Sequence, residues 1–391
     1  MEKVEQQEEP LTVDQEYDLW KSNVPLLYDF VSETRLTWPS LTLQWLPGDK
    51  TSTRQHLILG TLTSGAETDY LKIAALDLPD EIIIGKKSDK VVKSNLKVVK
   101  KFAHDGEINR ARYMPQNTNI IATVNGEGTI FIYDCSRDKQ SALLSTLKYH
   151  KDNAYGLAFN PNAEGELISG SDDSTIALWD ATNDKLKQPI QEWTTSHSDI
   201  VNDCQWHCFN TNMFGSVSED STLQLFDKRN GGKSDVKISS KGQYNSIAFS
   251  GFSENLFAAA GTTNNIYLYD IRNTGKILHS MTGHEEPVTS LEFSNDKDGI
   301  LISGSSDRRV IMWDLFEIGA EQQPDEADDG LPEVMMIHAG SRSAINDIST
   351  HPSIPWLNAS VEENNIVQVW KCSSKLPRIS GTPEVSISDL E

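Results

Sequence analysis

A segment that begins with His and ends with Asp recurs along this 391-residue chain. The clearest copies span residues 104–134, 150–180, 197–227 and 284–314, and in each the last Asp comes thirty residues after the first His. Each copy holds two runs of alternating β-branched and aromatic residues, a polar turn and a third such run, which predicts three β-strands. Two weaker copies occupy residues 244–270 and 338–370, so six copies are recognisable.

The length of the repeat favours one class of fold. Self-similarity at about 40–50 residues, with an aromatic residue before the closing Asp, is typical of β-propellers whose blades are four-stranded sheets. Residues 38–78 hold three further strand-like runs, which we interpret as an irregular first blade. We therefore predict an all-β fold, a seven-bladed β-propeller over residues 36–376. One blade should be completed from both ends of the chain, because the terminal repeats of a closed ring are irregular.

A helical pattern precedes the first blade. Large apolar residues recur at intervals of three or four, at Tyr17, Trp20, Val24, Leu27 and Val31. With Thr12 or Asp14 as a cap, this spacing predicts an amphipathic α-helix within residues 11–35, packed on the outside of the propeller and kinked or divided at Pro25. Leu26 and Phe30 add a second apolar row. We interpret that row as a surface for a partner; alternatively, the helix simply packs on its own domain.

Three segments lack the apolar residues that packing needs. Residues 1–10 are acidic and predicted to be disordered, residues 85–94 form a charged, mobile loop between strands, and residues 377–391 form a disordered tail. The lysines of 85–94 are interpreted as solvated side chains rather than as a nuclear-import signal.

The overall charge of the chain bounds its partners. A net charge of −22 argues against direct binding to nucleic acid and favours a strongly basic partner, although acidity also serves solubility alone. No apolar run is long enough for a membrane span or a signal peptide, so we expect no membrane association. The four cysteines follow no disulfide framework, which fits a reducing compartment. A closed propeller has little need to self-associate, so we expect a monomer within a hetero-complex.

A set of four side-chain types recurs within the full copies: the first His, a Ser or Thr, an Asp in the turn and an aromatic residue. The two clearest sets are His150, Ser169, Asp173 and Trp179, and His284, Ser303, Asp307 and Trp313. Ser, His and Asp together suggest a hydrolase triad. However, the set repeats from blade to blade and no G-x-S-x-G sequence accompanies it, so we interpret it as a structural hydrogen-bond network and predict no enzymatic activity.

Metal and cofactor chemistry have weak support in this sequence. Cys204, His207 and Cys208 lie in a predicted strand, whose successive side chains point to opposite faces, so three ligands do not converge there. The chain has no phosphate-binding lysine motif and no H-E-x-x-H motif. We expect neither metal nor cofactor.

An insertion interrupts the repeats near the end of the chain. The distance between the first His residues of successive copies rises to 54 residues between His284 and His338, against 46 and 47 earlier. The inserted segment, residues 317–333, has acids at Asp325, Glu326, Asp328 and Asp329, and an apolar row follows at 334–337. An acidic loop is often only a solvated loop. Together with the apolar surplus of the N-terminal helix, however, this segment predicts a groove for a basic amphipathic helix.

The repeats resemble WD-repeat propellers, in which the four recurring residue types form a structural tetrad. Three stretches outside the repeat pattern, EYDLWKSNVPLLYDFV, NRARYMPQN and PDEADDGLPEVMMIHAG, resemble a narrower family, the retinoblastoma-binding histone chaperones, and within it the fungal branch that serves type B histone acetyltransferases. The likeness runs from about Leu11 to Leu376.

This resemblance implies a ligand for the predicted groove, the first helix of histone H4. The implied apolar walls are Leu26, Leu27, Phe30, Met336, Ile337 and Leu376, and the implied acids are Glu326, Asp328 and Asp329. It further implies that the protein presents H4 to the catalytic subunit of a type B histone acetyltransferase, escorts H3–H4, and works in nucleus and cytoplasm. The alternatives are a subunit of a chromatin assembly, deacetylase or methyltransferase complex, or a general propeller adaptor. One departure is Leu331, where the family often has Pro.

The resemblance also implies a second site, on the narrow face of the propeller, for the tail of histone H3. The residues that match this site are Glu107, Asn109, Arg110, Tyr155, Asn245 and Glu363. The residues that depart from it are Asn153, Asn202, Pro287 and Thr289, where the family tends to have Glu at the first three and Phe at the last. Fewer carboxylates imply a weaker grip on a cationic tail.

Overall fold

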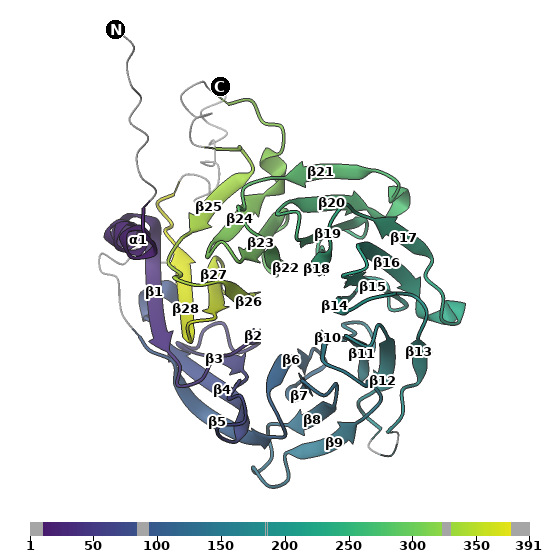
Figure 1. The fold of residues 1–391 in the computed structure, drawn as a ribbon. Coiled ribbons are helices and arrows are strands. Elements are labelled where there is room, and N and C mark those ends of the chain that lie inside the picture. Colours follow the sequence, from purple (N-terminus) through teal and green to yellow (C-terminus); the bar gives the residue numbers. More distant parts are fainter. Residues whose placement is uncertain (1–10, 84–93, 184, 186, 323–329, 377–391) are drawn as a thin grey trace, which may run out of the picture.

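The computed structural model describes residues 11–83, 94–183, 185, 187–322 and 330–376. Within these residues the strands form seven four-stranded sheets. Figure 1 shows the sheets arranged as blades around a central axis, with one strand of each blade innermost. The predicted seven-bladed, all-β propeller is therefore confirmed.

Six blades are built from strands that follow one another along the chain, and all of their pairings are antiparallel. The first two blades contain β2 (Leu43–Leu46), β3 (Arg54–Leu59), β4 (Asp69–Asp77) and β5 (Lys97–His104), then β6 (Ile108–Met114), β7 (Asn117–Asn125), β8 (Ile130–Asp134) and β9 (Leu143–Leu147). The next two contain β10 (Ala154–Phe159), β11 (Glu166–Ser171), β12 (Ile176–Asp180) and β13 (Gln191–Trp193), then β14 (Val201–Trp206), β15 (Met213–Ser218), β16 (Thr222–Asp227) and β17 (Val236–Ser239). The last two contain β18 (Tyr244–Phe249), β19 (Leu256–Gly261), β20 (Ile266–Asp270) and β21 (Ile277–Met281), then β22 (Val288–Phe293), β23 (Ile300–Ser305), β24 (Val310–Asp314) and β25 (Val334–His338). Short helical turns α2 (Asp80–Ile83), η1 (Lys228–Asn230), η2 (Ile271–Asn273) and η3 (Leu315–Glu317) follow strands β4, β16, β20 and β24.

The seventh blade closes the ring with strands from both ends of the chain. Three come from the C-terminal end, β26 (Ile345–Thr350), β27 (Leu357–Glu362) and β28 (Ile366–Cys372), and the outermost strand is β1 (Tyr28–Arg35). Val31 pairs with Trp370 and Thr34 with Val367 in this antiparallel ladder. The predicted closure from both ends is therefore confirmed, and it leaves neither terminus as a free blade.

The N-terminal helix is shorter than predicted. Helix α1 (Val13–Leu27) begins with a capping box, in which the backbone N–H of Gln15 donates to the Thr12 hydroxyl and the Thr12 backbone N–H donates to the Gln15 side chain. It ends two residues after Pro25, and Tyr28 already has extended backbone angles. The prediction of helix through residue 35 is wrong for residues 28–35, because the open edge of β28 supplies backbone partners for a strand there.

One face of α1 packs on the last two blades. Tyr17, Trp20 and Val24 are buried in one apolar cluster with Met312 of β24 and Trp370 of β28. This cluster is continuous with the interface between those two blades, so the helix is part of the folded core at that edge. Burial of such side chains stabilises the helix position by roughly 1.5–3 kcal/mol each when burial is complete.

The recurring sets of four side chains form hydrogen-bond networks within their blades. In one blade, Trp179 Nε1 donates to Ser169 Oγ at 2.9 Å, and Ser169 Oγ lies 2.7 Å from His150 Nε2. Asp173 Oδ1 lies 3.5 Å from His150 Nδ1. The blade with His284 repeats this arrangement, with Ser303 Oγ 2.6 Å from His284 Nε2, Asp307 Oδ2 2.8 Å from His284 Nδ1 and Trp313 Nε1 2.9 Å from Ser303 Oγ. The tetrad histidines and serines are buried between strands, where they tie loops to turns.

Candidate functional site

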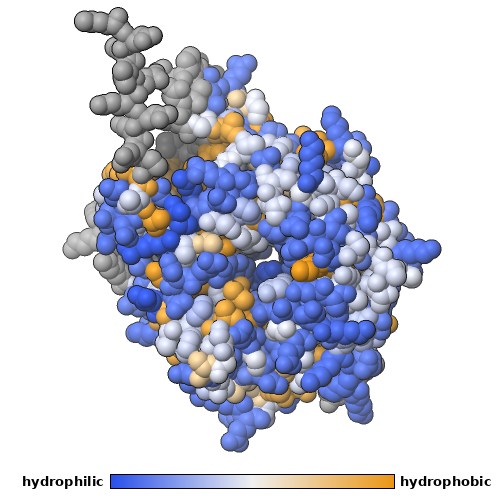
Figure 2. All heavy atoms as spheres, in the orientation of Figure 1, coloured by the Kyte–Doolittle hydropathy of each residue, from blue (hydrophilic) through white to orange (hydrophobic). Residues whose placement is uncertain are grey.

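The C-terminal end of α1 lies at an apolar cluster shared with β25. Met336 is buried in this cluster, and Leu27 and Leu376 pack partly buried against it. Their sequence neighbours Leu26 and Ile337 remain 69% and 42% exposed. Figure 2 shows hydrophobic side chains gathered on the surface where α1 lies in Figure 1. The structure thus brings a predicted set of wall residues from three distant segments to one edge of the propeller.

Phe30 is a correction to that set. It lies in β1 and is fully buried, in a cluster with Leu43, Trp45 and Val369. This cluster fills the space between the seventh and first blades, away from the surface. The prediction that Phe30 lines the groove is wrong, because residue 30 belongs to a strand and its side chain points into the core rather than along a helix face.

The acids predicted to face a basic ligand, Glu326, Asp328 and Asp329, lie outside the described residues. The segments on either side of them are close together. Gln322 Nε2 donates to the Gly330 carbonyl at 2.9 Å. Glu333 is buried, and its Oε1 lies 2.9 Å from His279 Nε2 on β21. The backbone N–H of Asp314 donates to the Glu333 carbonyl at 2.8 Å. The C-terminal end of the insertion is therefore fixed to the propeller at Glu333, and its two described flanks bond to each other.

Ion pairs fix the N-terminal half of α1. Arg308 Nη2 lies 2.7 Å from Glu16 Oε2, and the Arg342 guanidinium stacks 3.8 Å above the Tyr17 ring. The Tyr17 hydroxyl donates to Glu33 Oε2 at 2.9 Å. Burial and this hydrogen bond to Glu33 raise the pKa of Tyr17 to about 12. The first turns of the helix are thus held by side chains of the propeller, while Leu26 at the other end projects into solvent.

A pocket of about 260 Å³ is lined by residues at the starts of the innermost strands, at one end of the channel. Four residues predicted for the narrow face, Asn109, Arg110, Tyr155 and Asn245, line this pocket. Glu107 does not line it, and its carboxylate accepts a hydrogen bond of 2.6 Å from the backbone N–H of Ser64. Glu363 does not line it either. The structure therefore gathers the polar residues predicted for this face and leaves the two acids outside the pocket.

The asparagines of this pocket join neighbouring blades. In each case the side-chain Nδ2 donates to a backbone carbonyl of the next blade or its entry, from Asn109 to Ala154, Asn202 to Tyr244, Asn245 to Val288 and Asn346 to Ser40. Thr289 does the same through its hydroxyl to Ile345 at 2.7 Å. Sequence reasoning missed this ring. The sequence signal for this ring was an Asn or Thr at the second position of several innermost strands. Asn202 and Thr289, which depart from the family's pattern, therefore have a structural role in joining neighbouring blades.

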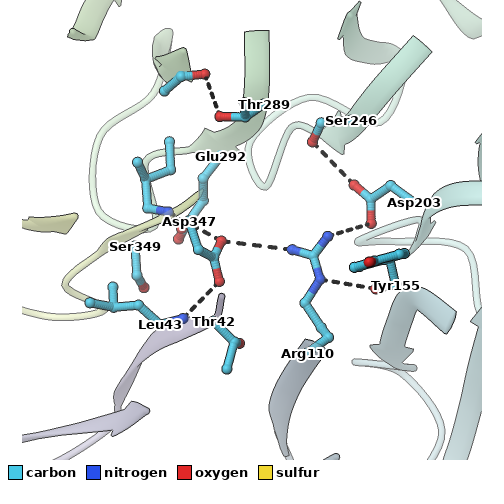
Figure 3. A network of polar contacts seen from close by, with 12 residues as sticks. Thr42, Leu43, Arg110, Tyr155, Asp203, Ser246, Thr289, Glu292, Asp347 and Ser349 are labelled. Carbon is cyan, nitrogen blue, oxygen red and sulfur yellow. Dashed lines mark hydrogen bonds and ion pairs between the residues drawn. The ribbon is translucent and has the colours of Figure 1, made fainter. Parts of the chain in front are cut away.

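Arg110 spans the channel below this pocket. Its guanidinium lies 3.7 Å from Asp203 on β14 and 3.7 Å from Asp347 on β26, and its Nε donates to the Tyr155 carbonyl at 3.0 Å (Figure 3). Arg112 adds a contact of 3.1 Å to Asp347. Asp203 and Asp347 are therefore already paired with arginines. They are poorly placed to hold a cationic tail that enters from the narrow face.

A third acid, Glu292, also lines the channel. Burial raises the pKa of Glu292 to about 7, although hydrogen bonds from Thr350 act in the opposite direction. Burial likewise raises the pKa of Asp203, although Arg110 opposes it. In both cases the main cause is desolvation of the carboxylate, which disfavours its charged form.

The described residues contain no cluster of three or more His, Cys, Asp or Glu side chains with the geometry of a metal site. Cys204 is buried, His207 Nε2 bonds to the Glu254 carbonyl at 2.8 Å, and Cys208 Sγ lies 3.7 Å from the Phe249 carbonyl. In the part of the chain that the structure describes, no helix has the length and apolar character that crossing a membrane requires.

Comparison with known proteins supplies the family. The family of the histone-binding protein RBBP4, which is also that of a component of the CAF1 complex, matches residues 15–80, and the WD domain, G-beta repeat, matches 141–180, 187–227 and 275–314. A Candida glabrata protein named histone acetyltransferase type B subunit 2 is 60% identical over 99% of this chain and 95% of its own length. This chain belongs to the histone acetyltransferase type B subunit 2 family. Members with the same name from Kluyveromyces lactis and Schizosaccharomyces pombe are 52% and 38% identical, over 100% and 97% of this chain and 100% and 94% of their own lengths.

The matched regions correspond to different elements of the propeller. Residues 15–80, which carry the histone-binding match, contain α1, β1 and the first three strands of the first blade. The histone-binding match therefore covers the helix and the strand that closes the ring, in addition to strands of the first blade. Each matched WD repeat begins near the outermost strand of one blade and ends with the third strand of the next, as in the match to 275–314, which contains β21 to β24. Successive repeats consequently interlock around the ring.

Proposed function

We propose that this protein is the histone-binding, non-catalytic subunit of a type B histone acetyltransferase, and that it holds the first helix of histone H4 between α1 and residues 317–337. The observation that carries the proposal is the apolar cluster of Leu27, Met336 and Leu376 at the end of α1, beside which Leu26 is 69% exposed. The shared name of the family members supports the enzyme complex, and the histone-binding match over residues 15–80 supports the ligand class.

The chemistry of this edge suits a basic amphipathic helix. The apolar face of such a helix would cover Leu26 and Ile337, each worth up to about 1.5–3 kcal/mol on full burial. Its Lys and Arg side chains would meet Glu326, Asp328 and Asp329, and the net charge of −22 would speed the encounter. The bond between Gln322 and Gly330 and the contact of Glu333 with His279 limit the conformational entropy lost on binding.

The protein would act by positioning. Holding H4 beside the catalytic subunit raises the local concentration of the H4 tail at that subunit's active site, so the chemical step stays with the partner. The Ser, His and Asp sets of the propeller repeat from blade to blade and are engaged in tetrads, which supports a non-catalytic role. We further propose that the protein escorts H3–H4 and works in both cytoplasm and nucleus, which fractionation of cells with an antibody to the protein would test.

Calorimetric titration with a peptide of the first H4 helix tests the proposal. We expect Leu26→Ala to weaken binding about tenfold, because a leucine contact of the interface is removed. Leu143→Ala is the matched control: Leu143 is 46% exposed on the outer strand β9 of the second blade. Equal affinity for wild type and Leu26→Ala, or no binding by the wild type, would overturn the proposed site.

A further inference from the structure

A buried chain of hydrogen bonds connects α1 to the last blade. Trp20 Nε1 of α1 donates to the Tyr28 hydroxyl at 3.0 Å, and that hydroxyl lies 2.8 Å from His338 Nδ1. His338 Nε2 lies 3.0 Å from Gln368 Oε1, and Gln368 Nε2 donates to the Gly340 carbonyl at 2.6 Å. All four side chains are buried, so this relay is shielded from water. It joins α1, β1, β25 and β28.

The two ends of the relay fix the direction of every hydrogen bond. The Trp20 indole is only a donor and the Gly340 carbonyl is only an acceptor. The Tyr28 hydroxyl therefore accepts from Trp20 and donates to His338 Nδ1, and Nε2–H of His338 donates to Gln368. This requires a neutral His338 protonated at Nε2. Burial lowers the pKa of His338 to about 3, which agrees with a neutral ring.

His338 occupies the position of the tetrad histidine in the seventh blade, but its ring nitrogens have different hydrogen-bond partners. In the blade with His284, Trp313 Nε1–H donates to Ser303 Oγ, and the Ser303 hydroxyl donates to His284 Nε2. Nδ1–H of His284 then donates to the Asp307 carboxylate. The tautomer of His338 is the opposite one. Its ring stacks on Trp370 with centroids 4.4 Å apart.

The rest of that tetrad is left without its usual contacts. Ser360 and Trp370 occupy the positions of Ser303 and Trp313, since each pair shares the same register within its blade. Among the described residues, Ser360 Oγ and Trp370 Nε1 are buried and have no hydrogen-bond partner. Unpaired buried polar atoms are rare and call for an explanation. Here the explanation is that Nε2 of His338, the nitrogen that would have bonded to Ser360, is engaged with Gln368.

The close approach of α1 also depends on a glycine. A Cβ atom at Gly340 would lie 2.6 Å from Trp20 Cζ2 and 2.6 Å from Gln368 Oε1, shorter than real contacts allow. Any larger residue at position 340 would push Trp20 outward or break the relay. The helix and the relay therefore share one tight site.

We propose that Tyr28, His338 and Gln368 are positioning residues, which hold α1 in register on the seventh blade so that the end bearing Leu26 forms the wall of the partner site. In this chain the last blade lacks the tetrad hydrogen bonds, because His338 bonds to Tyr28 and Gln368 instead. The inference rests on the proposed function for its ligand, the first H4 helix, but the anchoring of α1 is testable without any ligand.

Tyr28→Phe tests the relay by removing one oxygen atom. Tyr244→Phe is its matched control, because Tyr244 is equally buried and its hydroxyl bonds to Tyr269 at 3.0 Å in a distant blade. We expect the amides of α1 to exchange about tenfold faster in Tyr28→Phe than in wild type, and the H4 peptide to bind about threefold to tenfold more weakly. Tyr244→Phe should change neither quantity.

Gly340→Ala tests the same anchor by steric pressure, in case Tyr28→Phe fails to fold. Gly251→Ala is its control, since a Cβ at Gly251 meets nothing within 4 Å. Unchanged exchange in α1 for both Tyr28→Phe and Gly340→Ala would overturn the anchoring. Faster exchange with unchanged peptide affinity would overturn the positioning role. If the wild type does not bind the peptide, the proposed function fails, and the exchange measurement alone decides whether the relay holds α1.

Nitrogen-15 NMR of the histidine rings gives a signature that a purely steric role would not produce. We expect His338 to be protonated at Nε2 and His284 at Nδ1 in the same spectrum. In Tyr28→Phe, the His338 signals should move, because Nδ1 loses its donor, and the His284 signals should not. A His338 protonated at Nδ1 in the wild type would overturn the relay.

Discussion

Ser303 and Ser360 occupy the same position in two blades, yet their surroundings differ. Ser303 Oγ bonds to both His284 and Trp313, whereas Ser360 Oγ has no partner among the described residues. A repeated residue thus keeps its place in the sequence pattern after its contacts have changed. The contribution of a repeat position to stability is therefore set by the side chains around it. A comparison of Ser303 with Ser360 measures that contribution.

We expect Ser303→Ala to lower the free energy of unfolding by about 1–3 kcal/mol, because it leaves His284 Nε2 and Trp313 Nε1 buried without a partner. Ser360→Ala should change it by less than about 0.5 kcal/mol, since no hydrogen bond is lost. Urea unfolding of the two variants beside wild type measures both values. Equal losses for the two serines would contradict the assignment of a dismantled tetrad in the last blade.

The carboxylate of Asp307 gives a pH dependence. Burial acts to raise its pKa, but hydrogen bonds from His284 and from the backbone N–H groups of Glu285 and Arg309 outweigh burial and hold the pKa below its usual value. A lowered folded pKa stabilises the fold above the unfolded value, about 3.9, and this contribution is lost as pH falls through the folded value.

The stability difference between wild type and Asp307→Asn should therefore be constant between about pH 7 and 5 and shrink below about pH 4. Urea unfolding at a series of pH values gives this difference. A gap that is as large at pH 3 as at pH 7 would show that the carboxylate charge does not contribute.

At the scale of elements, β1 and α1 divide the N-terminal segment into a structural part and a surface part. Phe30 on β1 is fully buried between the seventh and first blades, while Leu26, four residues earlier on α1, is 69% exposed. The change from helix to strand at Tyr28 is what separates their roles. A strand directs Phe30 inward, and the last turn of a helix directs Leu26 outward.

Phe30→Ala should accordingly destabilise the propeller by about 3–5 kcal/mol, as for other buried phenylalanines. Leu26→Ala should leave the free energy of unfolding within about 0.5 kcal/mol of wild type, since its side chain packs against little of the fold. Thermal unfolding with a fluorescence readout of the buried tryptophans distinguishes the two. A large loss for Leu26→Ala would mean that this residue belongs to the core rather than to a binding surface.

For the whole molecule, the distribution of charge separates the two histone surfaces implied by the family. In the channel, Asp203 and Asp347 pair with Arg110 and Arg112, whereas the inserted segment 317–333 carries acids in sequence with no Lys or Arg among them. A net charge of −22 attracts a basic partner to the whole surface, but short-range contacts select the site. This difference in charge supports the proposed site at the edge of α1 rather than a site at the channel.

We expect binding of the H4 helix peptide to weaken at least about threefold between 50 and 500 mM salt, because exposed ion pairs are screened. The triple change of Glu326, Asp328 and Asp329 to Ala should weaken binding and remove most of this salt dependence. Calorimetry at several salt concentrations measures both effects. A triple variant that keeps the full salt dependence would place the contacts with the basic residues elsewhere, and an H3 tail peptide that binds as tightly as the H4 helix would reverse the order of the two surfaces.

The sequence by itself determined the architecture. Thirty-residue spacing from His to Asp, strand alternation and an irregular first blade were sufficient for seven blades closed from both ends, because these patterns are local and repeat. The motifs outside the repeats indicated the family, and the two apolar rows of the helix distinguished Leu27, which packs on the core cluster, from Leu26, which is exposed. The boundary of that helix was misjudged, because whether residues 28–35 form helix or strand depends on the edge of β28, more than 330 positions away.

Only the tertiary structure decided which polar residues are already engaged. Asn202 and Thr289 looked like departures from a binding pattern until their bonds to the neighbouring blades were visible, and Arg110 looked like a binding residue until Asp203 and Asp347 were found beside it. The role of His338 likewise depends on Tyr28, which is 310 positions away in sequence. Hydrogen bonds between side chains that are distant in sequence produce no periodic pattern in the sequence. The spacing of residues therefore predicts the strands, but it does not predict which side chains bond to each other across the ring.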